Sequence, residues 1–216
     1  MKETVIWWSA LVPWLLLVWS FQRLSGVLGW GGAALGAVLA TAALFFPWFG
    51  HPLPWWSASL SADFSIVMAG LVMVAIVQHA SGRVFFSPRE WRAAWIFGAL
   101  AALALYPSAF GVGPRNFDAY ALGWPWLFWR QSLLLFGGVA AVSSFLLWRG
   151  NRFGWLLLLA AAAYAGRLQE SDNYWDYIVD PVYGSVSLVA VLVIAWRRFF
   201  GSQPAGGGTT STKTSS

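Results

Sequence analysis

The sequence contains no cysteine and few charged residues. Without cysteine the chain forms no disulfide, holds no iron–sulfur cluster and has no thiolate nucleophile. Charged residues make up only 10% of the chain and hydrophobic residues 59%, whereas a soluble domain carries about a quarter charged residues. This composition leaves too little polar side chain for a water-soluble surface and predicts an all-α, polytopic membrane protein. The net charge of +5 is accordingly interpreted as a signal for membrane orientation and not for nucleic-acid binding.

Several catalytic and cofactor motifs are also missing. The sequence has no GxSxG and no HExxH pattern. Its two lysines, Lys2 and Lys213, lie outside the apolar runs, which excludes a retinal Schiff base. The two histidines, His51 and His79, fall on opposite sides of the predicted membrane, so they do not jointly ligate haem within one chain. Transport is not favoured, because the centres of the apolar runs contain almost no ionisable groups.

Apolar runs separated by short polar segments predict about seven transmembrane helices within a single domain, residues 1–200. Gly31, Gly32 and Gly36 in the second run are predicted to allow close helix packing. Residues 201–216 are rich in Gly, Ser and Thr and predict a disordered tail. A six-span count is the alternative, and it would place both termini on one side. The seven predicted spans are 4–21, 27–46, 64–79, 91–106, 127–148, 153–166 and 182–196.

The seven-span division separates the charges. Basic residues accumulate in cytoplasmic loops, which predicts an external N-terminus and a cytoplasmic C-terminus. Acidic residues contribute little to membrane insertion, so their separation needs another cause, and function is one candidate. The predicted cytoplasmic side holds nine of the thirteen basic residues, Arg23, Arg83, Arg89, Arg92, Arg149, Arg152, Arg197, Arg198 and Lys213, with Glu90. The predicted outer side holds Lys2, Arg115, Arg130 and Arg167 with seven acidic residues, Glu3, Asp63, Asp118, Glu170, Asp172, Asp176 and Asp180.

The chain has seventeen tryptophans, and fifteen of them fall near the ends of the predicted spans. The indole ring favours the headgroup zone of a bilayer, where its ring stays apolar and its N–H stays hydrated. We interpret the tryptophans as a dense aromatic belt. A stacking surface for a ring-bearing ligand is the alternative.

The most polar stretch before the tail runs from Arg167 to Pro181. If Ser171 or Asp172 caps a short helix there, then Asp172, Asp176 and Asp180 share one face at a spacing of four residues. Their mutual repulsion predicts a compensating cation. A solvated loop at the membrane interface is the structural alternative. As candidate catalytic residues this segment offers Glu170, Asp172, Asp176 and Asp180, and for weak metal binding Asp172, Asp176 and His51.

A second set of residues is predicted to bind a ligand or partner. Arg130 lies several residues inside the fifth span, where an unpaired charge is costly, so it is expected to pair with an acidic side chain or to reach the interface. Alternatively, it joins Arg115 and Arg167 in a clamp for a lipid phosphate. The full set of candidate binding residues is Arg115, Asp118, Arg130, Gln131, Arg167, Asn173, Trp175 and Tyr177.

These features predict an accessory or structural subunit of a bacterial cytoplasmic membrane. It would hold lipids and a membrane-protein partner through its outer acidic and aromatic loop, with no cofactor. The second hypothesis is an enzyme that acts on a lipid-linked phosphate at the outer leaflet. That enzyme would use the carboxylates for a divalent cation or for acid–base chemistry.

Overall fold

A helix occupies each of the seven apolar ranges that the sequence predicts. The computed structural model describes residues 3–26, 29–60, 64–112, 118–124 and 129–200, and all regular elements within these ranges are helical. The predicted tail lies outside the described residues. The long helices are α1 (Glu3–Leu24), α2 (Gly29–Phe45), α4 (Ile66–Ser81), α5 (Pro88–Ala109), α6 (Trp129–Trp148), α7 (Phe153–Ala165) and α9 (Pro181–Phe200). Short helical elements are α3 (Leu53–Leu60), η1 (Tyr120–Gly123) and α8 (Tyr174–Ile178).

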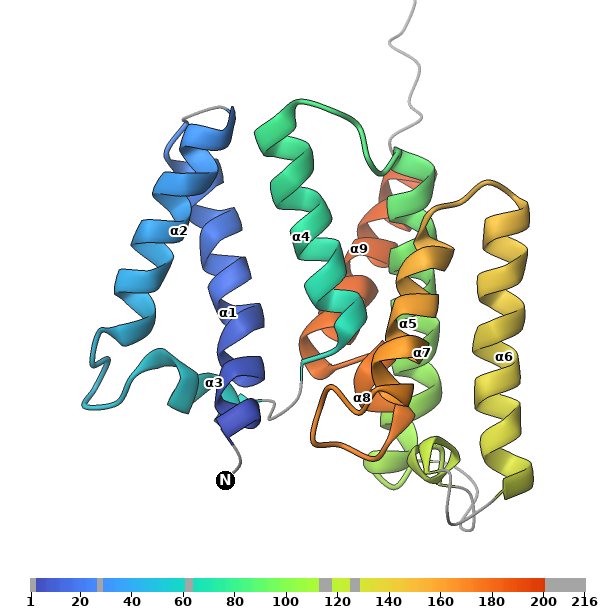
Figure 1. Cartoon of the computed structure of the whole chain (residues 1–216). Helices are drawn as coiled ribbons and strands as arrows, with labels where there is room; N and C mark the ends of the chain where they lie inside the picture. Colours follow the sequence, from blue (N-terminus) through green and yellow to red (C-terminus); the bar gives the residue numbers. More distant parts are fainter. Residues whose placement is uncertain (1–2, 27–28, 61–63, 113–117, 125–128, 201–216) are drawn as a thin grey trace, which may run out of the picture.

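Consecutive long helices run in opposite directions and pack side by side (Figure 1). α1 packs against α2 and α4, α5 against α9, α6 against α7, and α4 against α7. The short elements α3, η1 and α8 lie at the end of the molecule where α1, α4, α6 and α9 begin (Figure 1). We call this the first end, and the opposite end, where α4 meets α5 and α6 meets α7, the second end.

Local signals in the sequence set the starts of two of these helices. Ser65 caps α4, because its side chain accepts a hydrogen bond from the backbone N–H of Met68. Ser87 and Glu90 form a reciprocal capping box at the start of α5, with Pro88 in the first turn. These caps satisfy backbone N–H groups that a helix leaves without an internal partner.

Glycine permits the closest helix contacts. The buried face of α2 consists of Gly32, Gly36, Ala40 and Leu44, while Gly31 is exposed. A Cβ on Gly36 would come within 2.8 Å of the backbone oxygen of Val18 on α1. The small-residue face predicted for the second apolar run therefore exists, and it brings α2 against α1.

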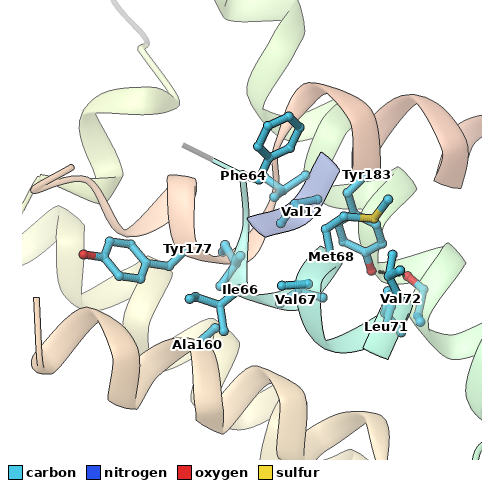
Figure 2. Close-up of a cluster of buried hydrophobic side chains, with 14 of the residues drawn as sticks. Val12, Phe64, Ile66, Val67, Met68, Leu71, Val72, Ala160, Tyr177 and Tyr183 are labelled. Carbon is cyan, nitrogen blue, oxygen red and sulfur yellow. Dashed lines mark hydrogen bonds between the residues drawn. The ribbon is translucent and has the colours of Figure 1, made fainter. Parts of the chain in front are cut away.

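The core lies where α4 meets α1, α7, α8 and α9. Val67 and Leu71 of α4 are fully or almost fully buried there, together with Tyr183 of α9. Figure 2 shows Tyr177 of α8 and Ala160 of α7 beside Ile66, with the phenolic oxygen of Tyr177 pointing away from the apolar cluster. The cluster joins helices from both halves of the chain, and it fixes the position of the segment before α9.

One described helix, Pro181–Phe200, is both long and apolar enough to cross a membrane by itself. Shorter apolar helices cover Ala10–Leu24, Gly29–Phe45, Ile66–Ser81, Leu133–Trp148 and Phe153–Ala165. The helical class of the prediction is thus confirmed.

Candidate functional site

The acidic segment that joins α7 to α9 is held against the start of α4. Its Gln169 side chain is buried and donates a hydrogen bond from Nε2 to the backbone oxygen of Phe64, at 2.6 Å. The backbone N–H of the same residue donates to the hydroxyl of Tyr177, at 3.1 Å. Arg167 precedes this anchor with a positive φ of 50°, and it is exposed. The segment is therefore fixed in place and is not a loosely solvated loop.

Helix α8 is shorter than the predicted one, and this corrects the predicted carboxylate face. α8 covers only Tyr174–Ile178, and its N-cap is Asn173, whose side chain accepts from the backbone N–H of Trp175. Asp172 and Asp180 lie outside it. Because the three carboxylates do not share one helix, the regular spacing of four residues does not bring them onto one face. The prediction failed because Asn173 supplies a better-placed cap than Ser171 or Asp172.

Asp180 is buried and joins the starts of two helices. Its Oδ1 accepts hydrogen bonds at 2.9 Å from the backbone N–H groups of Val182 and Tyr183, so it caps α9. Its Oδ2 accepts from the backbone N–H of Ser65 at 2.9 Å and from the Ser65 hydroxyl at 2.6 Å. The starts of two helices thus converge on one carboxylate. With both oxygens occupied, Asp180 holds the fold together at this point.

Asp176 is half-buried at the first end and bonds to two hydroxyl groups. Its Oδ2 accepts from the Tyr120 hydroxyl at 2.8 Å and from the Ser171 hydroxyl. Burial raises the pKa of this carboxyl, and the nearby Asp180 charge adds to the rise, although the two hydroxyl bonds oppose it. Tyr120 belongs to η1, so the bond also ties η1 to α8.

The other predicted binding residues of this segment are buried anchors. Asn173 donates from Nδ2 to the backbone oxygen of Tyr120 at 2.9 Å. Trp175 donates from its indole nitrogen to the backbone oxygen of Ala119 at 2.8 Å. Tyr177 is 1% exposed, and its hydroxyl donates to the backbone oxygen of Gln169. The three side chains bind η1 and the segment itself, so none of them faces an open surface.

Three carboxylates remain exposed around this network, and we call them the acidic rim: Asp118, Glu170 and Asp172. Asp118 accepts a hydrogen bond from the backbone N–H of Tyr120, which places it beside η1. Glu170 and Asp172 flank Ser171, and Ser171 bonds to Asp176 as Tyr120 does. The rim carboxylates thus adjoin the two residues that bond to Asp176, and they are exposed to solvent.

The remaining predicted residues do not add to this site. Arg115 lies outside the described residues, as do the side chains of Arg130 and Gln131, although α6 carries their backbone. His51 is exposed and stacks on Trp55 with a ring distance of 4.1 Å. Within the described ranges, no three His, Asp or Glu side chains gather as a metal site.

Sequence reasoning missed Ser65, Tyr120 and Gln169. Ser65 had a readable signal, because a serine directly before the apolar run Ile66–Ala69 is a typical N-cap. Tyr120 and Gln169 had no such signal. Their partners, Asp176 and Phe64, lie 56 and 105 residues away in the chain.

No protein-family model, no curated protein and no solved structure matches this chain.

Proposed function

We propose that this chain is a multi-pass membrane protein that serves as a non-catalytic accessory subunit. Its N-terminus faces the outside and its C-terminus the cytoplasm. The acidic rim forms the contact with a cationic segment of a membrane-protein partner at the outer surface.

The exposed surface of α9 is the observation that carries the membrane part of the proposal. The buried residues of this helix are Tyr183, Gly184 and Ser187. Its outward-facing residues include Leu192 at 68% and Trp196 at 65% exposure. A helix in water buries its apolar face, and an outward apolar face of this extent needs a nonpolar surrounding. Bilayer lipid supplies that surrounding without a further protein.

The ends of the helices support the orientation. Arg23 lies in the last turn of α1, and Arg197 and Arg198 lie in the last turn of α9. Both helices end at the second end of the molecule (Figure 1). The acidic rim lies at the first end, where α8 and η1 are found (Figure 1). Arginine is enriched on the cytoplasmic side of membrane proteins, so this separation favours a cytoplasmic second end.

The absence of native cysteine makes the orientation directly measurable. We propose two single-cysteine variants at exposed positions, Asp172→Cys at the rim and Arg149→Cys in the turn between α6 and α7. A membrane-impermeant maleimide should label position 172 in intact cells, and position 149 only after permeabilisation. Labelling of both positions from the same side would reject the seven-span orientation.

The hydrogen-bond partners of the carboxylates favour an accessory role over the role of an outer-leaflet enzyme. An acid–base or metal-binding enzyme needs carboxylate oxygens that face its substrate or ion. Asp180 directs both oxygens to backbone and hydroxyl donors of the protein, and Asp176 bonds to Tyr120 and Ser171. The rim carboxylates are exposed on a fixed framework, which suits recognition of a basic surface.

A photo-crosslinking amino acid at Leu168, which is 60% exposed beside the rim, tests the partner contact. In native membranes we expect one discrete protein adduct, and we expect Glu170→Lys combined with Asp172→Lys to remove it. The matched control, Arg197→Gln with Arg198→Gln at the other end, should retain the adduct. An adduct that persists after charge reversal of the rim would reject this contact.

A further inference from the structure

An apolar cleft opens between four helices near the second end. Its volume is about 430 Å³, and α1, α4, α5 and α9 all contribute to its walls. Trp91 and Trp95 stack with a ring distance of 5.5 Å to form part of the α5 wall. The other walls include Leu16 and Trp19 of α1, Val72 of α4 and Val186 of α9. The shape and chemistry suit a hydrocarbon chain.

A polar basin of about 310 Å³ adjoins this cleft. Arg23, Ala75 and Trp91 line both spaces, so the two lie side by side. The basin adds Arg83 and His79 to its lining. The Arg23 guanidinium lies 5.9 Å from the centre of the Trp19 ring, at the junction of cleft and basin. Together they form a site with an apolar body and a cationic mouth.

The mouth carries positive charge with no acidic side chain in its lining. Glu90 is the acidic residue that the described chain places at the second end, and its carboxylate accepts from the backbone N–H groups of Ser87 and Arg152. Among the described residues, the ion pair is Arg152 with Glu90, at 3.8 Å. Arg23 and Arg83 are therefore left to bind an external anion.

We propose that this site binds one anionic phospholipid from the cytoplasmic leaflet. Its phosphate lies between Arg23 and Arg83, and one acyl chain follows the cleft past Trp19 and Leu16. From Arg23 to Leu16, α1 extends about 10 Å into the molecule. Arginine binds phosphate through paired N–H donors, and basic pockets between membrane helices recognise anionic headgroups. The proposal rests on the membrane setting of the proposed function, and it does not depend on the acidic rim.

A photoreactive lipid tests the site on the full chain. Purified protein is reconstituted in phosphatidylcholine vesicles with a trace of phosphatidylglycerol that carries a diazirine on its acyl chain. We expect adducts on the α1 and α4 peptides that line the cleft, at least fivefold more than from phosphatidylcholine with the same diazirine. Arg23→Gln with Arg83→Gln should reduce these adducts to the phosphatidylcholine level.

Further variants distinguish binding at this site from nonspecific attraction of anionic lipid to positive charge on the protein. Arg197→Gln with Arg198→Gln removes the same two charges from residues outside the cleft and basin, and it should leave the adducts unchanged. Ala75→Phe, which fills the junction, should lower the adducts of both lipids. Equal labelling by the two lipids, or equal loss in both arginine pairs, would overturn the proposal. Glu170→Lys with Asp172→Lys should not alter lipid labelling. A result that rejects the partner contact at the rim is therefore distinguishable from one that rejects the lipid site.

Discussion

The carboxylate of Asp180 accepts two hydrogen bonds from Ser65, one from its backbone N–H and one from its hydroxyl. The same hydroxyl accepts from the backbone N–H of Met68, and the same carboxylate accepts from Val182 and Tyr183. Two residues that are 115 positions apart thus cap two helices and bind each other. This connection sets the position of the acidic segment relative to α4.

Replacement of Asp180 by alanine should strongly destabilise the protein. The change removes the cap of α9 and leaves the buried N–H of Ser65 without an acceptor. We expect a loss of about 3 kcal/mol in the free energy of unfolding, which combines a lost cap with a buried unsatisfied donor. Denaturant unfolding in detergent measures it. Asp172→Ala, at an exposed position, is the control and should change little.

Ser65 and Asp180 should show strong energetic coupling. Ser65→Ala removes the cap of α4 and one donor to Asp180. In a double-mutant cycle, the loss for Ser65→Ala with Asp180→Ala should be about 1–2 kcal/mol smaller than the sum of the single losses. Additive losses would show that the two caps act separately.

The Asp176 carboxyl should make stability depend on pH. Burial raises its pKa above the usual 3.8 in the folded protein, so the folded state holds this proton more tightly than the unfolded state. Stability from this group therefore increases as the pH falls through the raised pKa, and the increase is complete below 3.8. Asp176→Asn removes the titrating group. Between about pH 7 and about pH 4, the melting temperature of the wild type should rise relative to that of the variant. A constant difference would contradict the raised pKa.

Gly98 should tolerate no side chain at the contact between α5 and α9. A Cβ there would overlap the Ser187 hydroxyl and approach Cζ of Tyr183 to 2.7 Å. Gly98→Ala should cost about 1–3 kcal/mol, because α5 and α9 must move apart. Gly137 on α6 is the matched control, since a Cβ there meets nothing within 4 Å. Gly137→Ala should leave the melting temperature unchanged or slightly higher, and equal losses in the two variants would contradict the close packing.

Glu90 should stabilise the second end in two ways, as part of the cap of α5 and through a bond to the start of α7. It accepts from Ser87 within the α5 capping box and from the backbone N–H of Arg152 at the start of α7. Glu90→Ala should lower the free energy of unfolding by about 2 kcal/mol, mainly through the loss of these partly buried hydrogen bonds. The side chain of Arg152 is 61% exposed, so the ion pair itself adds little. Denaturant unfolding in detergent measures this loss, and Arg89→Ala, at the exposed neighbouring position, should have little effect on it.

The local sequence pattern was sufficient to predict the positions of the long helices and to indicate where some of them begin. The apolar runs predicted α1, α2, α4, α5, α6, α7 and α9 within a few residues, because helix formation in such runs depends on neighbouring residues in the chain. Ser87-Pro-Arg-Glu90 is a capping box that can be read directly from the sequence. The position of Gly36 in a small-residue stripe likewise indicated a close helix contact, and the structure identifies α1 as the partner helix.

The roles of the carboxylates depended on partners distant in the chain. From the sequence, Asp172, Asp176 and Asp180 looked alike, four residues apart. In the structure, Ser65 makes Asp180 a buried cap, Tyr120 holds Asp176, and Asp172 stays exposed. The cleft beside Arg23 also needs four helices at once. The spacing of apolar runs determined a chain of apolar helices, since helix formation depends on residues that are neighbours in the chain. Tertiary packing decided which charges are buried, because burial depends on residues that only the fold brings together.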